Sequence, residues 1–215
     1  MELRAHFRKQ LRVVEDKVEL LLAFIPQDLV AVTEALLNRD GEDEVLPIVA
    51  EHERVVDSLY KEVEALVDEL VTLQAPVASD ARYLLSVLRV VPELERSHDL
   101  VVHLAYQATH IRGADLSPRA RELVQCMGSI GSDMWLQAAT AWYDRDASVA
   151  ETLDERDDEL DTWHIALVNE LAAGQLPTRM IMDMTLVARF YERLGDHAVN
   201  IGRRAAVMVG LPAPA

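Results

Sequence analysis

The chain has 215 residues, of which 50% are hydrophobic, and its 21 Lys and Arg residues against 37 Asp and Glu residues give a formal net charge of −16. This length fits one large domain or two of about 100 residues each. The apolar content is enough for a packed core and argues against general disorder. So acidic a chain would repel nucleic acid and anionic lipid, because binding a phosphate backbone requires Lys and Arg to displace its counterions. Cations and basic protein surfaces are the better candidate partners.

The signals of secreted and membrane proteins are missing from this sequence. The single cysteine, Cys126, excludes an internal disulfide. The first 22 residues mix charges throughout and so lack the apolar segment of a signal peptide. No run approaches the ~18–20 uninterrupted apolar residues that a membrane span requires. We therefore expect a cytoplasmic protein that does not span the membrane.

Helical periodicity runs nearly from end to end. Apolar residues recur at intervals of three and four, which is the period of an amphipathic helix, and no segment alternates like a strand. Glycines lie where helices should stop and prolines where they should start. The sequence predicts six helices, at residues 3–38, 44–73, 77–112, 118–144, 147–173 and 177–209. Long helices joined by short loops pack as antiparallel neighbours, so each set of three should form a bundle.

The two sets of helices look like copies of each other. The sequence ERSHD at 95–99 corresponds to ERLGD at 192–196, and ERVVD at 53–57 corresponds to DDELD at 157–161. The two offsets, 97 and 104 residues, differ by seven, which is two helical turns and leaves the helical faces aligned. A period near 100 residues indicates duplication rather than a solenoid. We predict an all-α fold of two tandem three-helix bundles, residues 1–113 and 114–215.

Each half carries two pairs of acidic residues spaced four apart, which places both members of a pair on one helical face. The pairs are Glu53/Asp57 and Glu95/Asp99 in the first half, and Asp157/Asp161 and Glu192/Asp196 in the second. A single such pair is more often a solvated surface, but four at matched places favour a functional acidic surface. Four neighbouring carboxylates repel one another unless protons or cations intervene. Hard oxygen ligands suit Mg²⁺, Mn²⁺, Ca²⁺ or iron.

Two histidines lie near these acids. His52 and His98 fall on apolar stripes, where a core histidine is more often satisfied by hydrogen bonds than by a metal. Yet Glu95-x-x-His98 has the form that di-iron proteins use in pairs. Because only one such pair is complete, a carboxylate-bridged di-iron oxidase or hydrolase is kept as the alternative. Motifs for phosphate-binding loops, zinc proteases and serine hydrolases are absent from the sequence, so we expect a protein that is not an enzyme.

Three segments resemble the PhoU family of phosphate-signalling adaptors: ERLGDHAVNI at 192–201, ERSHD at 95–99 and QAPVASDAR at 74–82. The likeness covers essentially the whole chain. It implies a cytoplasmic, often dimeric protein that binds divalent or ferric ions (Mg²⁺, Mn²⁺, iron or Zn²⁺) through its acidic pairs. It also implies negative regulation of phosphate uptake and of the phosphate-starvation response. The implied partners are the ATPase subunit of the phosphate importer and a phosphate-responsive sensor histidine kinase.

The first repeat departs from this family pattern more than the second. Ser97-His98 replaces the step that Leu194-Gly195 preserves, and Glu53 stands where an aspartate is usual. We expect Gly195 to allow a close helix crossing. We expect His98 to lie at a partly exposed position, where it would crowd the first acidic site or add a nitrogen ligand to it.

Overall fold

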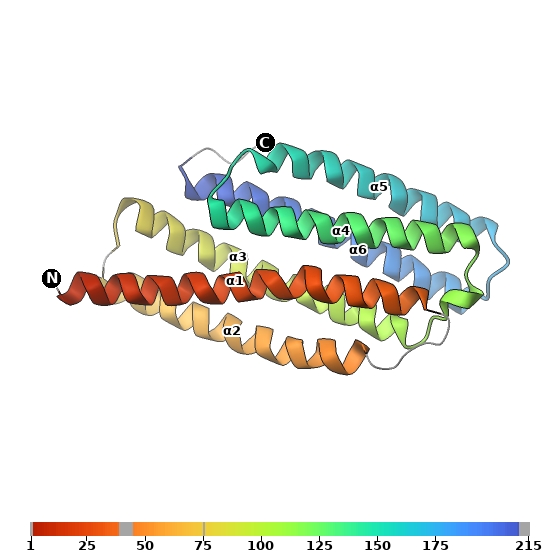
Figure 1. Ribbon diagram of the computed structural model, residues 1–215, viewed down its shortest axis with the longest axis horizontal. Coiled ribbons are helices and arrows are strands. Elements are labelled where there is room, and N and C mark those ends of the chain that lie inside the picture. The colour runs from red at the N-terminus through yellow and green to blue at the C-terminus, as the bar shows by residue number, and fades with distance from the viewer. Residues whose placement is uncertain (1, 39–44, 75, 211–215) are drawn as a thin grey trace.

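The computed structural model describes residues 2–38, 45–74 and 76–210, and six long α-helices make up most of this part of the chain (Figure 1). The helices are α1 (Glu2–Leu37), α2 (Val45–Gln74), α3 (Ala78–Ala108), α4 (Pro118–Asp144), α5 (Val149–Ala173) and α6 (Thr178–Met208), with a short 3-10 turn at Gly113–Asp115. The described residues contain no strand, and the all-α prediction is confirmed. The largest difference from the predicted bounds is at the end of α3, which stops at Ala108 rather than at 112.

The start of α4 follows from local sequence. Ser117 is the N-cap residue, and its side chain accepts a hydrogen bond of 3.0 Å from the backbone N–H of Ala120. Pro118 occupies the first helical turn, where its missing N–H has no partner to lose. The N-cap serine and the proline after it therefore fix the residue at which α4 begins.

The two sets of three helices lie side by side along their length (Figure 1). In the first set α2 packs on α1 and α3, and in the second α5 packs on α4 and α6. Contacts of α1 with α4 and of α3 with α6 join the two sets. The four joining helices thus form the middle of the molecule, with α2 and α5 at its edges. The predicted tandem three-helix bundles are confirmed as the architecture.

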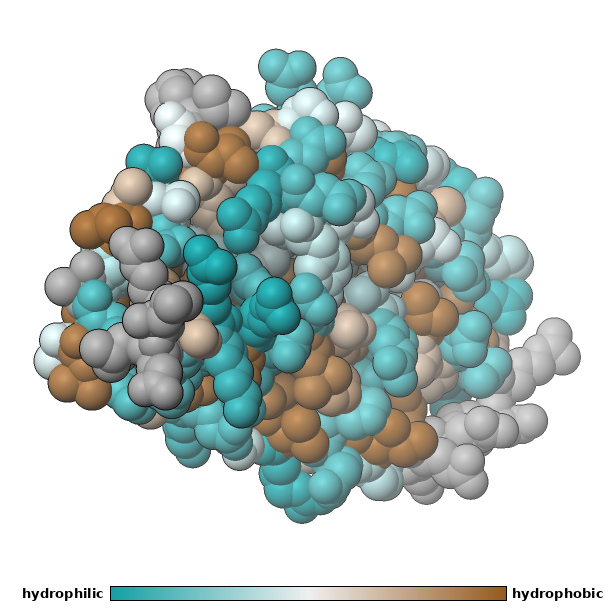
Figure 2. Space-filling model, turned by 60° about the vertical axis from the view of Figure 1, so that its left-hand side comes forward, coloured by the Kyte–Doolittle hydropathy of each residue, from teal (hydrophilic) through white to brown (hydrophobic). Residues whose placement is uncertain are grey.

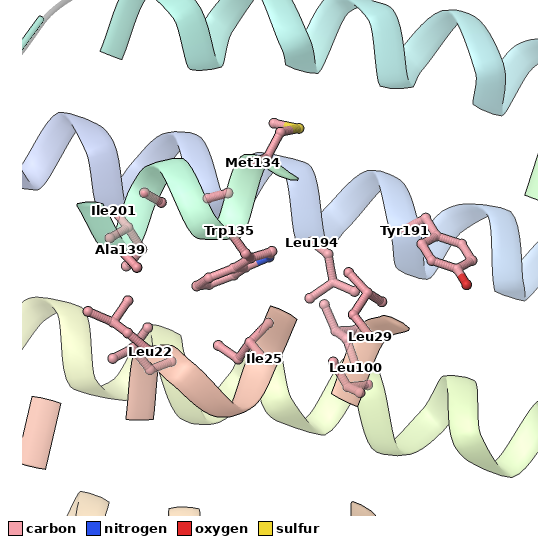
Figure 3. Packing of buried hydrophobic residues seen from close by; sticks show 14 of the residues in the cluster. Leu22, Ile25, Leu29, Leu100, Met134, Trp135, Ala139, Tyr191, Leu194 and Ile201 are labelled. Atoms are coloured by element: carbon pink, nitrogen blue, oxygen red, sulfur yellow. The ribbon is translucent and has the colours of Figure 1, made fainter. Parts of the chain in front are cut away.

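One hydrophobic core runs through both bundles. Trp135 of α4 is fully buried, and Figure 3 shows it between Ile25 of α1 and the helices of the second bundle. Leu194 of α6 and Leu100 of α3 are both buried and lie near each other in the same view. On the side shown in Figure 2, hydrophobic side chains are scattered among hydrophilic ones. Because the core is shared, the division between residues 113 and 114 stays a prediction.

The contact between α3 and α6 has an approximate two-fold symmetry. Asn200 donates a hydrogen bond of 2.9 Å to the Glu93 carboxylate, and the rings of His103 and Phe190 stack with centroids 5.5 Å apart. Glu93 corresponds to Phe190, and His103 to Asn200, at the offset of 97 residues that relates the repeats. Exchanging the repeats therefore maps one contact onto the other. The two helices run antiparallel, with the symmetry axis between these contacts.

Helix α1 supplies much of the core. Within the described residues, the stretch Ala5–Leu37 is long and apolar enough to span a membrane, with a mean hydropathy of 1.7 in its best window. However, 56% of that window is buried inside the fold. Leu21, Leu22 and Ile25 are each 0–1% exposed. Its apolar residues are those of a core helix.

Candidate functional site

The structure brings the four predicted carboxylates of the first repeat together between α2 and α3. The pKa of Asp99 is raised to about 7 by burial, by a hydrogen bond with Glu53, and by the negative charges of Glu53, Glu95 and Asp57. The pKa of Glu95 is also raised, by burial and then by Asp57. Both effects require the acids to be near neighbours. We call these four residues the first acidic cluster.

The second repeat gathers its acids in the same way between α5 and α6. Burial, followed by the charges of Asp196, Asp161 and Glu192, raises the pKa of Asp157 to about 7. The pKa of Glu192 is raised by burial and by Asp196, although Arg189 forms an ion pair with it. The other carboxylate oxygen of Glu192, Oε2, is buried without a hydrogen-bond partner. We call these four residues the second acidic cluster.

Both clusters have the donor chemistry of a hard-cation site but not its final geometry. The pKa values of Asp99 and Asp157 are raised, whereas the hydrogen bond with His98 lowers the pKa of Glu53, and the free Glu192 oxygen is an unused ligand atom. Among the described residues, no three or more His, Cys, Asp or Glu side chains converge closely enough to hold a metal ion. Binding would therefore require the carboxylates to rotate toward one another.

His98 is a buried residue, and the expectation that it lies at a partly exposed position is wrong. Its side chain is 0% exposed, its Nε2 lies 2.9 Å from Asp28 Oδ2, and its Nδ1 lies 3.1 Å from Glu53 Oε2. Burial alone lowers the pKa of His98, but the hydrogen bonds with Asp28 and Glu53 outweigh it, so the pKa is raised. His98 is thus a core histidine satisfied by hydrogen bonds, as its apolar stripe indicated.

Asp28 is the residue near the site that sequence reasoning missed. It is 2% exposed, and its two carboxylate oxygens lie 2.8 and 2.9 Å from His52 Nδ1, in addition to the contact with His98. The sequence feature that could have identified Asp28 is its place between the apolar residues Ile25 and Leu29 of α1. An unpaired carboxylate buried there would be costly. Such an acid requires buried partners, and the two histidines on apolar stripes supply them.

Within residues 114–210, the second repeat has no counterpart of this network. Gly195 stands at the position of His98, and a Cβ atom there would lie 2.5 Å from Leu160 Cδ2 and 2.7 Å from Asp157 Oδ1. The predicted close helix crossing at Gly195 is confirmed. A histidine side chain at this position would not fit beside Leu160 and Asp157.

A groove of about 630 Å³ opens beside the second cluster, between α5, α6 and the edge of α3. Asp157 and Asp196 line it together with Arg193, His197 and Asn200. Burial lowers the pKa of His197, and the positive charges of Arg193 and Arg96 lower it further, against the opposite effect of Glu93. His197 Nδ1 lies 2.8 Å from Ser97 Oγ across the α3–α6 contact. The groove thus gives solvent access to the second cluster.

Comparisons with known proteins agree with the repeats seen here. The PhoU domain matches residues 28–108 and again 124–205. The phosphate-specific transport system accessory protein PhoU homolog 1 of Mycobacterium tuberculosis is 32% identical over 82% of this chain and 80% of its own length. The PhoU homolog of Synechocystis is 29% identical over 96% of this chain and 92% of its own. The crystal structure of PhoU from Pseudomonas aeruginosa superimposes with a TM-score of 0.86 over 94% of this chain and 98% of that one, at 23% identity, and so shares the fold.

Proposed function

This chain belongs to the PhoU family, and on that premise we propose that it is an accessory protein of a phosphate transport system, which regulates phosphate uptake and the phosphate-starvation response negatively. Two PhoU domains cover both repeats. The relatives named as accessory proteins of such systems match over at least four-fifths of both chains. In this role the protein acts by binding other proteins rather than by catalysis.

The partners in this proposal are the ATPase subunit of the phosphate importer and a phosphate-responsive sensor histidine kinase. In this proposal the protein works in the cytoplasm, as a homodimer. The long exposed helix faces supply enough surface for more than one partner.

We further propose that the two acidic clusters bind divalent or ferric ions (Mg²⁺, Mn²⁺, iron or Zn²⁺). Glu53, Asp57, Glu95 and Asp99 would hold one site, and Asp157, Asp161, Glu192 and Asp196 the other. The observation that carries this proposal is the recurrence of four carboxylates at matched places in both PhoU domains, with raised pKa values in each. A filled cluster removes negative charge from the surface, so metal occupancy would change which partner docks.

The second cluster is the better candidate of the two. It opens on the groove beside α6, and in the described part of the chain no histidine is hydrogen-bonded to its carboxylates. In the first cluster Glu53 is already hydrogen-bonded to His98. No observation favours the di-iron enzyme, because the second Glu-x-x-His pair that such a centre requires has Gly195 in place of the histidine.

Metal analysis tests the metal part of this proposal. Wild-type protein and the variant Glu192→Gln/Asp196→Asn would be dialysed against Mn²⁺, freed of excess metal, and analysed for metal content. We expect the variant to lose about half of the bound metal. The matched control, Asp133→Asn/Asp144→Asn, removes two exposed acids of α4 and should keep full content. Full metal content in the Glu192 and Asp196 variant would contradict the assignment of the second site.

Gene deletion tests the regulatory part. Loss of the gene should release phosphate-starvation genes from repression in phosphate-rich medium, and expression of the wild-type chain should restore repression. Normal repression in a strain that lacks this gene and every paralogue would contradict the proposed role.

A further inference from the structure

Exposed charge is distributed unevenly in this acidic protein. On α3 and α6, which the structure describes in full, the exposed charged residues are Arg82, Arg89, Arg96, Arg179, Arg189 and Arg193, with Asp196 as the only acid among them. On α5 the most exposed charged residues are acidic (Glu151, Glu155, Asp158, Glu159 and Asp161), and the partly exposed Arg156 is paired with Glu159. The most exposed charged residues of α3 and α6 are therefore mainly arginines, while the acids Asp80, Glu93, Glu95, Asp99, Asp183 and Glu192 of these helices are half-buried.

The same two helices expose large apolar side chains. Leu85 and Tyr106 of α3 are each 52% exposed, and Met182 and Leu186 of α6 are 64% and 46% exposed. Interfaces between proteins are enriched in Arg, Tyr and Met and depleted in Lys, Glu and Asp. No lysine lies on α3 or α6. This face therefore combines exposed arginines with exposed apolar side chains, and protein interfaces use both.

Two arginines lie at the centre of this face. Arg96 and Arg193 hold equivalent positions in the repeats and flank the approximate two-fold axis, where Ser97 meets His197. Neither arginine forms an ion pair with another residue in the part of the chain that the structure describes, whereas Arg189 is paired with Glu192. Two guanidinium groups are thus available to a partner at the middle of the α3–α6 contact.

We propose that the exposed face of α3 and α6 is the docking surface for an acidic, amphipathic segment of another protein. Its carboxylates would pair with Arg96 and Arg193, and its apolar side chains would cover Tyr106 and Leu186. Charge complementarity supports this occupant, because it would steer an acidic segment to the exposed arginines of α3 and α6 and away from the acidic exposed residues of α5. The inference rests on the proposed function, since the partner is a protein of the phosphate transport system.

Each acidic cluster lies between one helix of this face and its outer neighbour, α2 or α5, and would modulate the affinity of the face. Empty clusters between α2 and α3 and between α5 and α6 place negative charge at both edges of the surface and repel an acidic segment. Cations bound there would remove that repulsion. Divalent metal should therefore strengthen docking without contributing a direct contact.

The experiment compares two charge reversals in the full chain. The variant Arg96→Glu/Arg193→Glu changes the proposed surface, and the control Arg8→Glu/Arg12→Glu makes the same change in net charge on exposed positions of α1. Kd would be measured by calorimetry against the purified ATPase subunit of the importer and the cytoplasmic part of the kinase. The milder variant Arg96→Gln/Arg193→Gln is measured alongside, and circular dichroism checks folding.

We expect the surface variant to bind at least about tenfold more weakly and the control within about twofold of wild type, with binding weakened by added NaCl. If wild type binds and the surface variants bind equally well, the docking surface is wrong and the proposed function stands. If wild type binds neither protein, the proposed function is wrong and the docking proposal falls with it. A dimer that the surface variants convert to monomer, measured by light scattering, would show that a second copy covers this face and would overturn the proposal.

Discussion

Asp28 and His98 are buried partners, with Asp28 Oδ2 2.9 Å from His98 Nε2 and neither residue more than 2% exposed. The pair links α1 to α3, and the other nitrogen of His98 continues the network to Glu53 of α2. All three helices of the first bundle are thus joined by polar contacts at the level of the first acidic cluster. The second bundle makes the corresponding crossing with Gly195 against Leu160.

Removing one member of this buried network should be strongly destabilising. We expect Asp28→Ala to lower the free energy of unfolding by about 3–5 kcal/mol, because it removes the buried carboxylate that pairs with buried His98 and half-buried His52. The control Asp133→Ala, at an exposed position of α4, should change it by no more than about 0.5 kcal/mol. Urea denaturation at pH 7 measures both. Equal, small losses in the two variants would show that the network contributes little.

The close crossing at Gly195 predicts a contrast between two glycines. Alanine is favoured over glycine in a helix by about 1 kcal/mol, but a Cβ atom at Gly195 would overpack Leu160 and Asp157, which typically costs about 1–3 kcal/mol. Gly195→Ala should therefore be destabilising and weaken metal binding at the second cluster. At Gly131 the nearest atom, Leu29 Cδ2, is 3.3 Å away.

Gly131→Ala is thus the matched control, and it should leave stability within about 1 kcal/mol of wild type and metal affinity unchanged. Chemical denaturation and titration with Mn²⁺ measure the two properties. If both glycines tolerate alanine equally well, the crossing at Gly195 is looser than its contacts indicate.

The fold could be predicted from sequence because its determinants are local or repeated. Apolar periodicity, with the prolines and glycines at helix ends, predicted the bounds of α4 that the structure has, Pro118–Asp144. The internal duplication predicted the two bundles. The gathering of Glu95 and Asp99 with the acids of α2 followed from four-residue spacing on neighbouring helices. These inferences needed no knowledge of how distant side chains pack.

The remaining features depend on contacts between helices that spacing does not encode. Asp28 is 70 residues from His98 in the chain, and nothing in its own helix indicates that partner. The apolar stripe correctly predicted a core position for His98, whereas the expectation of a partly exposed position was wrong. The arginine-rich face could not be predicted from the overall charge, because its arginines lie on α3 and α6, which are adjacent only in the folded protein.

A buried hydroxyl pair joins the two bundles and gives a third prediction. Thr33 of α1 donates to the backbone oxygen of Leu29 at 2.7 Å, so the Tyr191 hydroxyl, 2.7 Å away, is the donor to Thr33 Oγ1. Tyr191→Phe should lower stability by about 1 kcal/mol. Thr33→Val should lower it by about 1–3 kcal/mol, because it leaves the Tyr191 hydroxyl buried without a partner.

The double variant separates this interaction from packing. If the hydroxyls interact, Tyr191→Phe/Thr33→Val should be less destabilised than the sum of the single variants. Tyr143→Phe, which removes an exposed hydrogen bond to the backbone oxygen of Glu19, is the control and should change stability by less than about 0.5 kcal/mol. Strict additivity in urea denaturation would contradict a direct hydroxyl pair.

The last prediction concerns pH and the carboxylate of Asp157 in protein freed of metal by a chelator. The pKa of Asp157 is raised to about 7 in the fold from an ordinary value of 3.8, so between these values the folded state binds more protons than the unfolded state. Its contribution to stability therefore declines as pH rises from about 4 to about 7, and the loss stays constant above that.

The variant Asp157→Asn should have the same Tm as wild type near pH 4 and a higher Tm than wild type at pH 8. An increase of about 2 °C would correspond to a gain near 1 kcal/mol, a modest value because the side chain is partly exposed. Added Mn²⁺ should reverse the order at pH 8, because an ion that binds the folded wild type stabilises it and the variant has lost a ligand. A variant less stable than wild type at pH 8 without metal would show that Asp157 has a favourable partner in the fold, and the second cluster would then need no cation.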